Sequence, residues 1–238
     1  MKLDILAFGA HPDDVELGCA GTIAKEISLG KKVGIIDLTR GELGTRGTAE
    51  IRDQEAAKAA QILNVQIREN LNFRDGFFKN DELHQLEIIK IIRKFKPEIV
   101  LCNAINDRHI DHPKGSQLVS DSCFLSGLTK IETYLENNKQ EAWRPKAVYH
   151  YIQWKNIEPD FVVDISEHID LKMQSILAYS SQFYDPKSNE PETPITSKNF
   201  LDSVKYRAQD LGRLVGVAYA EGFTTERYLA VNSLQNLL

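Results

Sequence analysis

Two stretches of this 238-residue chain carry side chains that could bind a metal ion and act on a substrate. The first spans residues 10–16 (AHPDDVE). An imidazole and a carboxylate three residues apart, His11 and Asp14, can converge on one cation, and zinc accepts both ligand types. The extra carboxylate of Asp13 is then available as a base toward a metal-activated water. The alternative interpretation is that the two aspartates only cap a helix and complement its dipole.

The second stretch spans residues 103–113 (NAINDRHIDHP). It contains two of the six histidines of the chain, His109 and His112, with Asp111 between them. Imidazole and carboxylate groups again stand close together in the sequence. Two such clusters favour a metal site over two unrelated loops, provided that the fold brings them to the same place.

Each cluster is predicted to lie where a strand ends and a helix begins. The apolar run 3–9 predicts a buried strand, and the spacing of apolar residues over 16–29 predicts a helix. Residues 97–102 predict the strand before the second cluster, and Pro113 suits the first turn of a helix that continues to residue 125. If both strands belong to one parallel sheet, both clusters lie at the same edge, where open α/β sheets bind ligands.

The rest of the chain continues the alternation of strands and helices. Further strands are expected at 33–38, 67–73, 147–152 and 161–165, and further helices at 48–63, 81–94, 166–177 and 200–217. Thr48, Asp81 and Ser166 are the expected helix caps. Residues 132–145 are expected to form a helix end and a loop, and residues 184–197 a long loop. The pattern predicts a single α/β domain over residues 1–238, a Rossmann-like three-layer sandwich with a mostly parallel sheet and an elaborated C-terminal part.

Composition argues against several classes of protein. The net charge of −5 argues against a nucleic-acid partner, which usually requires a basic surface. The three cysteines are widely spaced without a Cys-x-x-Cys pair, which argues against a disulfide scaffold and a cysteine zinc site. The chain begins directly with the first predicted strand, and no apolar run approaches the ~20 residues of a membrane span. We therefore expect a cytoplasmic protein without a membrane partner.

Two arginines are candidates for substrate contacts. Arg52 falls in the first turn of the helix predicted after Thr48, where a cation opposes the helix dipole. A substrate or an active-site carboxylate could favour a cation there, and the alternative is an exposed arginine without a functional role. Arg108 lies within the second cluster, beside His109.

With both clusters in view, the chain resembles the LmbE-like (PIG-L) family of zinc-dependent N-acetyl-sugar deacetylases. The resemblance is carried by residues 10–16, by residues 109–112 (HIDH), by the glycine-rich region 38–56 and by residues 219–223 (YAEGF). It extends over nearly the whole chain. The glycine-rich loop and the chain length are most similar to the bacillithiol-pathway enzymes that deacetylate N-acetylglucosaminyl malate. Chitooligosaccharide deacetylases and mycothiol-pathway enzymes share the same core motifs.

The resemblance implies a role for most of these residues. The implied zinc ligands, with another divalent metal as the alternative, are His11, Asp14 and His112. Asp13 is implied as general base and then acid, and Asp111 as the carboxylate that orients His109, so that a protonated His109 can donate to the oxyanion or to the departing amine. Arg52 and Arg108 are implied as substrate-binding residues, since an arginine fits the carboxylates of malate.

The implied reaction is hydrolysis of N-acetylglucosaminyl malate to glucosaminyl malate and acetate. The family resemblance also implies a homo-oligomer, a hexamer. Three alternatives are a deacetylase of another N-acetyl sugar such as a chitooligosaccharide, a non-catalytic carbohydrate-binding α/β protein, and a nucleotide-binding α/β protein. The last lacks the Gly-x-Gly-x-x-Gly fingerprint and places acids where a pyrophosphate needs N–H groups.

Overall fold

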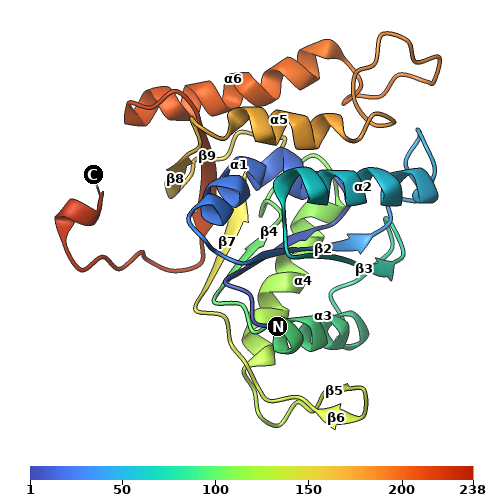
Figure 1. The fold of residues 1–238 in the computed structure, drawn as a ribbon. Helices are drawn as coiled ribbons and strands as arrows, with labels where there is room; N and C mark the ends of the chain where they lie inside the picture. Colours follow the sequence, from blue (N-terminus) through green and yellow to red (C-terminus); the bar gives the residue numbers. More distant parts are fainter. Residues whose placement is uncertain (238) are drawn as a thin grey trace.

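The computed structural model describes residues 1–237, and most of its strands form one sheet (Figure 1). The strands of this sheet are β1 (Ile5–Gly9), β2 (Val33–Thr39), β3 (Ile67–Phe73), β4 (Ile99–Cys102), β7 (Ala147–Tyr151), β8 (Phe161–Asp164) and β9 (Ala220–Thr225). Their order across the sheet is β3-β2-β1-β4-β7-β9-β8. The first five are parallel to one another, and β9 runs antiparallel to both β7 and β8.

Helices cover both faces of the sheet and complete a three-layer α/β sandwich (Figure 1). The α-helices within residues 1–237 are α1 (Asp14–Ser28), α2 (Ala49–Leu63), α3 (Glu82–Phe95), α4 (Asp111–Ser126), α5 (Ile169–Leu177) and α6 (Lys198–Val215), and a 3-10 turn η1 spans Leu234–Leu237. Helices α3 and α4 pack on one face, and α1 and α2 on the other. Helices α5 and α6 pack outside α1 and α2. The predicted fold class is therefore confirmed.

The alternation of side chains along β1 explains how one strand supports both layers. Ile5 and Ala7 pack toward α1, while Leu6 and Phe8 pack toward α3 and α4, because successive side chains of a strand point to opposite faces. All residues of β1 and β2 are buried. Such continuous apolar strands are typical of a parallel sheet that is covered on both faces.

The two clusters do meet at one edge of this sheet. Strand β1 pairs with β2 on one side and with β4 on the other, so the chain reverses its direction of winding between β1 and β4. The loops that follow β1 and β4 carry the two histidine and aspartate clusters. Ligands of open α/β sheets bind at this kind of switch point, outside the carboxyl ends of the strands.

Several local predictions are confirmed and two are wrong. Thr48 and Asp81 cap α2 and α3 by accepting hydrogen bonds from the amides of Ile51 and His84. Ser166 does not cap α5, because its hydroxyl donates to the Asp164 carboxylate at 2.6 Å and the N-cap position is His168. Residues 132–145 contain a small hairpin, β5 (Tyr134–Leu135) and β6 (Asn138–Lys139), in place of a helix end, and residues 220–225 form β9.

No helix within residues 1–237 is long and apolar enough to cross a bilayer.

Candidate active site

The turn between β1 and α1 carries the first cluster. Asp13 occupies the N-cap position with φ 109° and ψ −21°, and its side chain makes no capping hydrogen bond. A non-glycine residue in such a backbone conformation costs about 1–3 kcal/mol, and strain of this kind collects at functional sites. The Asp14 carboxylate accepts a bond from the backbone N–H of His11 at 2.9 Å. The side chains of Asp13 and Asp14 are therefore held for a purpose other than capping the helix.

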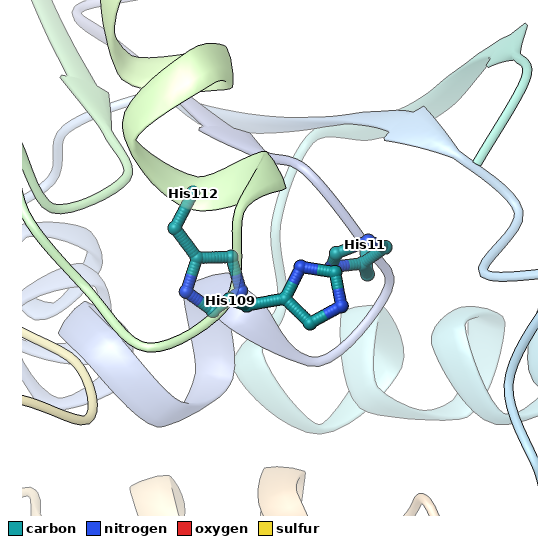
Figure 2. Close-up of side chains that lie close together, drawn as sticks. All are labelled: His11, His109 and His112. Atoms are coloured by element: carbon teal, nitrogen blue, oxygen red, sulfur yellow. The ribbon is translucent and has the colours of Figure 1, made fainter. Parts of the chain in front are cut away.

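Three imidazole rings gather at the carboxyl edge of the sheet, as Figure 2 shows. His11 comes from the loop after β1, while His109 and His112 come from the turn before α4 and its first turn. The ring centroids of His11 and His109 lie 4.6 Å apart, and those of His109 and His112 lie 5.1 Å apart. One nitrogen from each ring lies within 4.8 Å of the other two. The two clusters thus form one site.

The Asp14 carboxylate lies between two of these rings. One oxygen is 3.5 Å from Nδ1 of His11, and the other is 3.1 Å from Nε2 of His112. The side-chain amides of Asn103 and Gln153 each donate to Asp14 at 2.9 Å, which fixes its orientation. Two imidazole nitrogens and one buried carboxylate are a donor set that suits zinc and similar divalent ions.

The far nitrogen of each of these two imidazoles contacts another carboxylate. Nε2 of His11 lies 3.1 Å from Asp75 and 3.4 Å from Asp111. Nδ1 of His112 lies 2.6 Å from Asp107. Carboxylates that hold the outer nitrogen of a histidine are the usual surroundings of metal-ligating imidazoles, because they set the tautomer and the ring orientation.

The charges of the site also fit a cation. Burial lowers the pKa of His112, but the carboxylates of Asp14 and Asp107 outweigh it and raise this pKa to about 9. Burial likewise lowers the pKa of His11, and its carboxylate neighbours raise it well above the ordinary value. The buried carboxylates around these two rings favour positive charge there, and a divalent cation would supply that charge in place of protons.

Asp13 stands outside the group formed by Asp14 and the two imidazoles that face it, and is bonded to Arg52. Nη2 of Arg52 donates to Asp13 Oδ2 at 2.8 Å and also to the backbone carbonyl of Pro12. Burial raises the pKa of Asp13 to about 7 against the opposing pull of Arg52. A carboxylate with a pKa near neutrality is suited to accept a proton and return it.

This contact contradicts the alternative that Arg52 is an exposed arginine. Both Arg52 and Asp13 are buried, and the guanidinium is bonded to the carboxylate and to two backbone carbonyls, those of Pro12 and Gly41. Arg52 therefore serves an active-site carboxylate. Arg52 also lines the cavity described below, and its Nε is buried with no hydrogen-bond partner within residues 1–237, so its expected role in substrate binding stays a prediction.

The expected pairing of Asp111 with His109 is wrong. The Asp111 carboxylate accepts bonds from the Gly76 amide at 2.8 Å and from Lys114 at 2.7 Å, and it faces His11. Nδ1 of His109 instead accepts the backbone N–H of Asp111 at 3.3 Å. The reason is that α4 begins at Asp111, which turns its side chain away from the preceding loop toward the loop after β3.

Comparisons with known proteins agree with this site. The profile of the PIG-L family, described as GlcNAc-PI de-N-acetylase, matches residues 6–123, which include both clusters. The conserved protein TT1542 from Thermus thermophilus is 35% identical in sequence, with a TM-score of 0.85 over 97% of this chain and 98% of that protein. This chain belongs to the PIG-L family.

Two further relatives of this PIG-L family member carry functional names. The diacetylchitobiose deacetylase of Thermococcus kodakarensis is 29% identical over 75% of this chain and 70% of its own length. A probable N-acetyl-alpha-D-glucosaminyl L-malate deacetylase of Bacillus subtilis is 28% identical over 76% of this chain and 84% of its own length. The family and these relatives support deacetylase activity on an N-acetyl sugar or its conjugate.

In this PIG-L protein the cluster opens into a cavity of about 460 Å³, which is within the range of small-molecule sites. The side chains of His11, Asp13, Asp14, His109 and His112 all line it. Arg108 lines it as well, exposed, with its guanidinium carbon 4.6 Å from the ring centroid of Trp154. Within residues 1–237 Arg108 makes no ion pair, so its charge is available to a ligand.

Four residues surround His11, Asp14 and His112 in this PIG-L protein; from the sequence, no role was predicted for Asn103 and Asp107 of the second cluster, and Asp75 and Gln153 were not singled out. Asp75 follows β3, Asn103 and Asp107 follow β4, and Gln153 follows β7. Asn103 accepts the amide of Ala10 at 2.8 Å and donates to Gln153 at 2.8 Å, so it joins the ends of three strands. Each of these residues follows a parallel strand, and that position was the signal that could have identified them.

Proposed function

We propose that this protein hydrolyses the N-acetyl group of an N-acetylglucosamine conjugate in a metal-dependent reaction, releasing acetate and a free amine. The observation that carries the proposal is the carboxylate of Asp13. It is buried and bonded to Arg52, and it stands outside the group formed by Asp14 and the two imidazoles that face it. A site that only binds a sugar has no need of this carboxylate, whereas amide hydrolysis needs a base.

The residues proposed to hold the metal, zinc or another divalent cation, are His11, Asp14 and His112. His11 would offer Nδ1 and His112 would offer Nε2, because these atoms face Asp14 while the opposite nitrogens contact other carboxylates. When bound, such a cation lowers the pKa of water and polarises an amide carbonyl. Three protein ligands are the number that catalytic zinc sites use.

We assign the proton transfers to Asp13. Its carboxylate accepts a proton from the attacking water and later returns it to the nitrogen of the leaving amine. The Arg52 guanidinium holds the carboxylate in one orientation through both steps. Loss of a positioned base of this kind typically costs ~10²–10⁴ in rate.

His109 is proposed to stabilise the oxygen of the acetamide as negative charge develops on it. Its Nδ1 accepts the N–H of Asp111, so the proton of a neutral ring lies on Nε2 and can be donated. Burial and the positive charges of His11 and His112 lower the pKa of His109. These surroundings support a neutral donor in place of the protonated His109 expected from the sequence.

The substrate that we propose is N-acetylglucosaminyl malate. Arg108 supports it, since an unpaired guanidinium in the cavity suits a carboxylate. The named malate deacetylase among the relatives supports it too. The alternative is an uncharged N-acetyl sugar, which the similarity to a diacetylchitobiose deacetylase favours.

The test is a comparison of amine release from N-acetylglucosaminyl malate, diacetylchitobiose and N-acetylglucosamine by the purified protein with its metal content measured. We expect about one divalent ion per chain and a catalytic efficiency at least tenfold higher on the malate conjugate. Metal content undiminished in both His11→Ala and His112→Ala would overturn the ligand assignment. No acetate release from any of the three compounds would refute the proposed activity.

Three other expectations remain proposals. They are that residues 1–238 form a single domain, that the protein is cytoplasmic, and that it assembles as a homo-oligomer, with a hexamer expected from the family resemblance. Light scattering after size-exclusion chromatography measures the assembly directly.

A further inference from the structure

Arg207 of α6 lines the same cavity as the catalytic residues, although no sequence motif drew attention to it. A second hollow of about 200 Å³ adjoins this cavity, and the two share Trp154, Phe200 and Arg207 in their walls. Arg207 therefore lies where the catalytic cavity continues outward. A group attached to the sugar would extend into this region.

The contacts of Arg207 leave much of its guanidinium unused. Nη2 donates to the backbone carbonyl of Trp154 at 2.7 Å. Nε is buried and has no hydrogen-bond partner in the described part of the chain. Within residues 1–237 no carboxylate lies within ion-pair distance of Arg207, and Asp107 acts on it only at longer range. A half-buried cation without an anion is energetically unfavourable, so a ligand that brings an anion to Arg207 would bind more tightly than a neutral one.

Two other arginines of the cavity differ from Arg207 because each has a carboxylate partner, although their Nε atoms are also buried without a hydrogen bond within residues 1–237. Arg52 is bonded to Asp13, and Arg46 contacts Ser188 and Glu190 of the long loop. Among the arginines that line the cavity in the described part of the chain, only Arg108 shares the unpaired state, and it lies against the ring of the tryptophan whose carbonyl binds Arg207. Two unpaired guanidinium groups thus meet at one residue, Trp154.

We propose that Arg207, together with Arg108, forms a subsite for a carboxylate-bearing aglycone and determines the choice of substrate. This inference rests on the proposed function and adds the residue that discriminates between conjugates. The aromatic ring of Trp154, stacked on Phe200 with centroids 5.2 Å apart, lines both the cavity and the adjoining hollow. A guanidinium recognises a carboxylate with paired, charge-assisted hydrogen bonds, which a neutral second sugar cannot form.

The test uses Arg207→Gln, which keeps an N–H donor for the Trp154 carbonyl and removes the charge, and Arg207→Lys, which keeps the charge. Arg213→Gln is the matched control, because Arg213 lies on the same helix, exposed and paired with Asp210. Catalytic efficiency is measured on N-acetylglucosaminyl malate and on diacetylchitobiose. Binding of glucosaminyl malate is measured by calorimetry for each protein.

We expect Arg207→Gln to lose about ten- to hundredfold in efficiency on the malate conjugate, mainly through KM, since hydrogen bonds to charged groups are of that strength. Its loss on diacetylchitobiose should be less than threefold, Arg207→Lys should recover part of the loss, and Arg213→Gln should match the wild type on both compounds. Calorimetry should show the same weakening for glucosaminyl malate.

Equal losses on both substrates would overturn the subsite. Arg207 would then either support Trp154 or bind the leaving acetate, and inhibition by added acetate distinguishes these two roles. Unchanged malate turnover and binding in Arg207→Gln would also overturn it while leaving the proposed function intact. If no compound is hydrolysed but glucosaminyl malate binds and Arg207→Gln weakens it, the subsite stands and the proposed function fails.

Discussion

Replacement of Asp13 by Asn tests the central step of the proposed mechanism with little disturbance of the structure. Asparagine has the same shape as aspartate and tolerates the positive φ of 109° found at this position. It also keeps an oxygen that can accept the Arg52 N–H now bonded at 2.8 Å. The substitution removes the ability to take up a proton and leaves the groups of His11, Asp14 and His112 unchanged.

The magnitudes follow from these contacts. Loss of a positioned base costs ~10²–10⁴ in kcat, which corresponds to about 2.7–5.4 kcal/mol of barrier. Asp13→Asn leaves the buried Arg52 guanidinium without its anion, although Arg52 keeps its bonds to the carbonyls of Pro12 and Gly41, so the free energy of unfolding should fall by about 3–5 kcal/mol. Activity is therefore measured at a temperature well below the Tm of the variant, so that a loss of turnover reports the missing base and not unfolding.

The assay measures amine release over a range of pH together with the metal content of each protein. The wild type should gain activity as pH rises through the pKa of Asp13, which burial raises to about 7, because the base must be deprotonated. Asp13→Asn should lose this dependence and keep one metal ion per chain. Turnover within threefold of the wild type would refute the assignment of Asp13 as base, and loss of the metal would show that Asp13 is a ligand.

The remaining predictions concern residues around the site and in the core. Asp75→Asn should weaken metal affinity about 10- to 100-fold, because Asp75 holds Nε2 of His11 at 3.1 Å. Titration with a competing chelator measures this affinity. Unchanged affinity would show that Asp75 does not support His11 as a metal ligand. Lys172→Met should lower the free energy of unfolding by about 3–5 kcal/mol, because it leaves the buried Glu221 without its cation at 2.7 Å, and a loss below 1 kcal/mol in urea unfolding would contradict this. Burial lowers the pKa of His150, but the contacts of this ring with Cys102 and Glu226 outweigh burial and raise the pKa to about 10. His150 therefore adds stability that is fully present below about pH 6.5 and is lost as pH rises toward 10. Tm should fall more steeply over this range in the wild type than in His150→Gln. Parallel curves of Tm against pH would contradict this role of His150.

The sequence by itself determined the parallel part of the sheet and the place of the site. The apolar runs at 3–9 and 33–38 are visible without any partner, because burial on both faces demands continuous hydrophobic residues. Polar clusters after two such strands must meet at one edge when the strands are parallel and adjacent, as β1 and β4 are. This local information was sufficient to predict that His11 and Asp14 lie near His109 and His112.

The tertiary structure alone decided which of these groups contact one another. Arg52 faces Asp13, and Asp111 faces His11 instead of His109, because the paths of two loops and the start of α4 set the directions of these side chains. No periodicity in a sequence encodes such paths.

The strand β9 and its surroundings show the same limit over a longer range. Glu221 accepts the backbone amides of Gly21 and Thr22 and pairs with Lys172, although about two hundred residues separate it from α1. The segment AEGFTT mixes strand formers with Ala, Glu and Gly, which are depleted in strands, so its local signal is weak, and its place in the sheet comes from pairing with β7 and β8 and from the contacts of Glu221. Arg207 was hidden for a related reason, since the lack of an ion-pair partner is a property of the folded cavity and cannot be seen in the order of the residues.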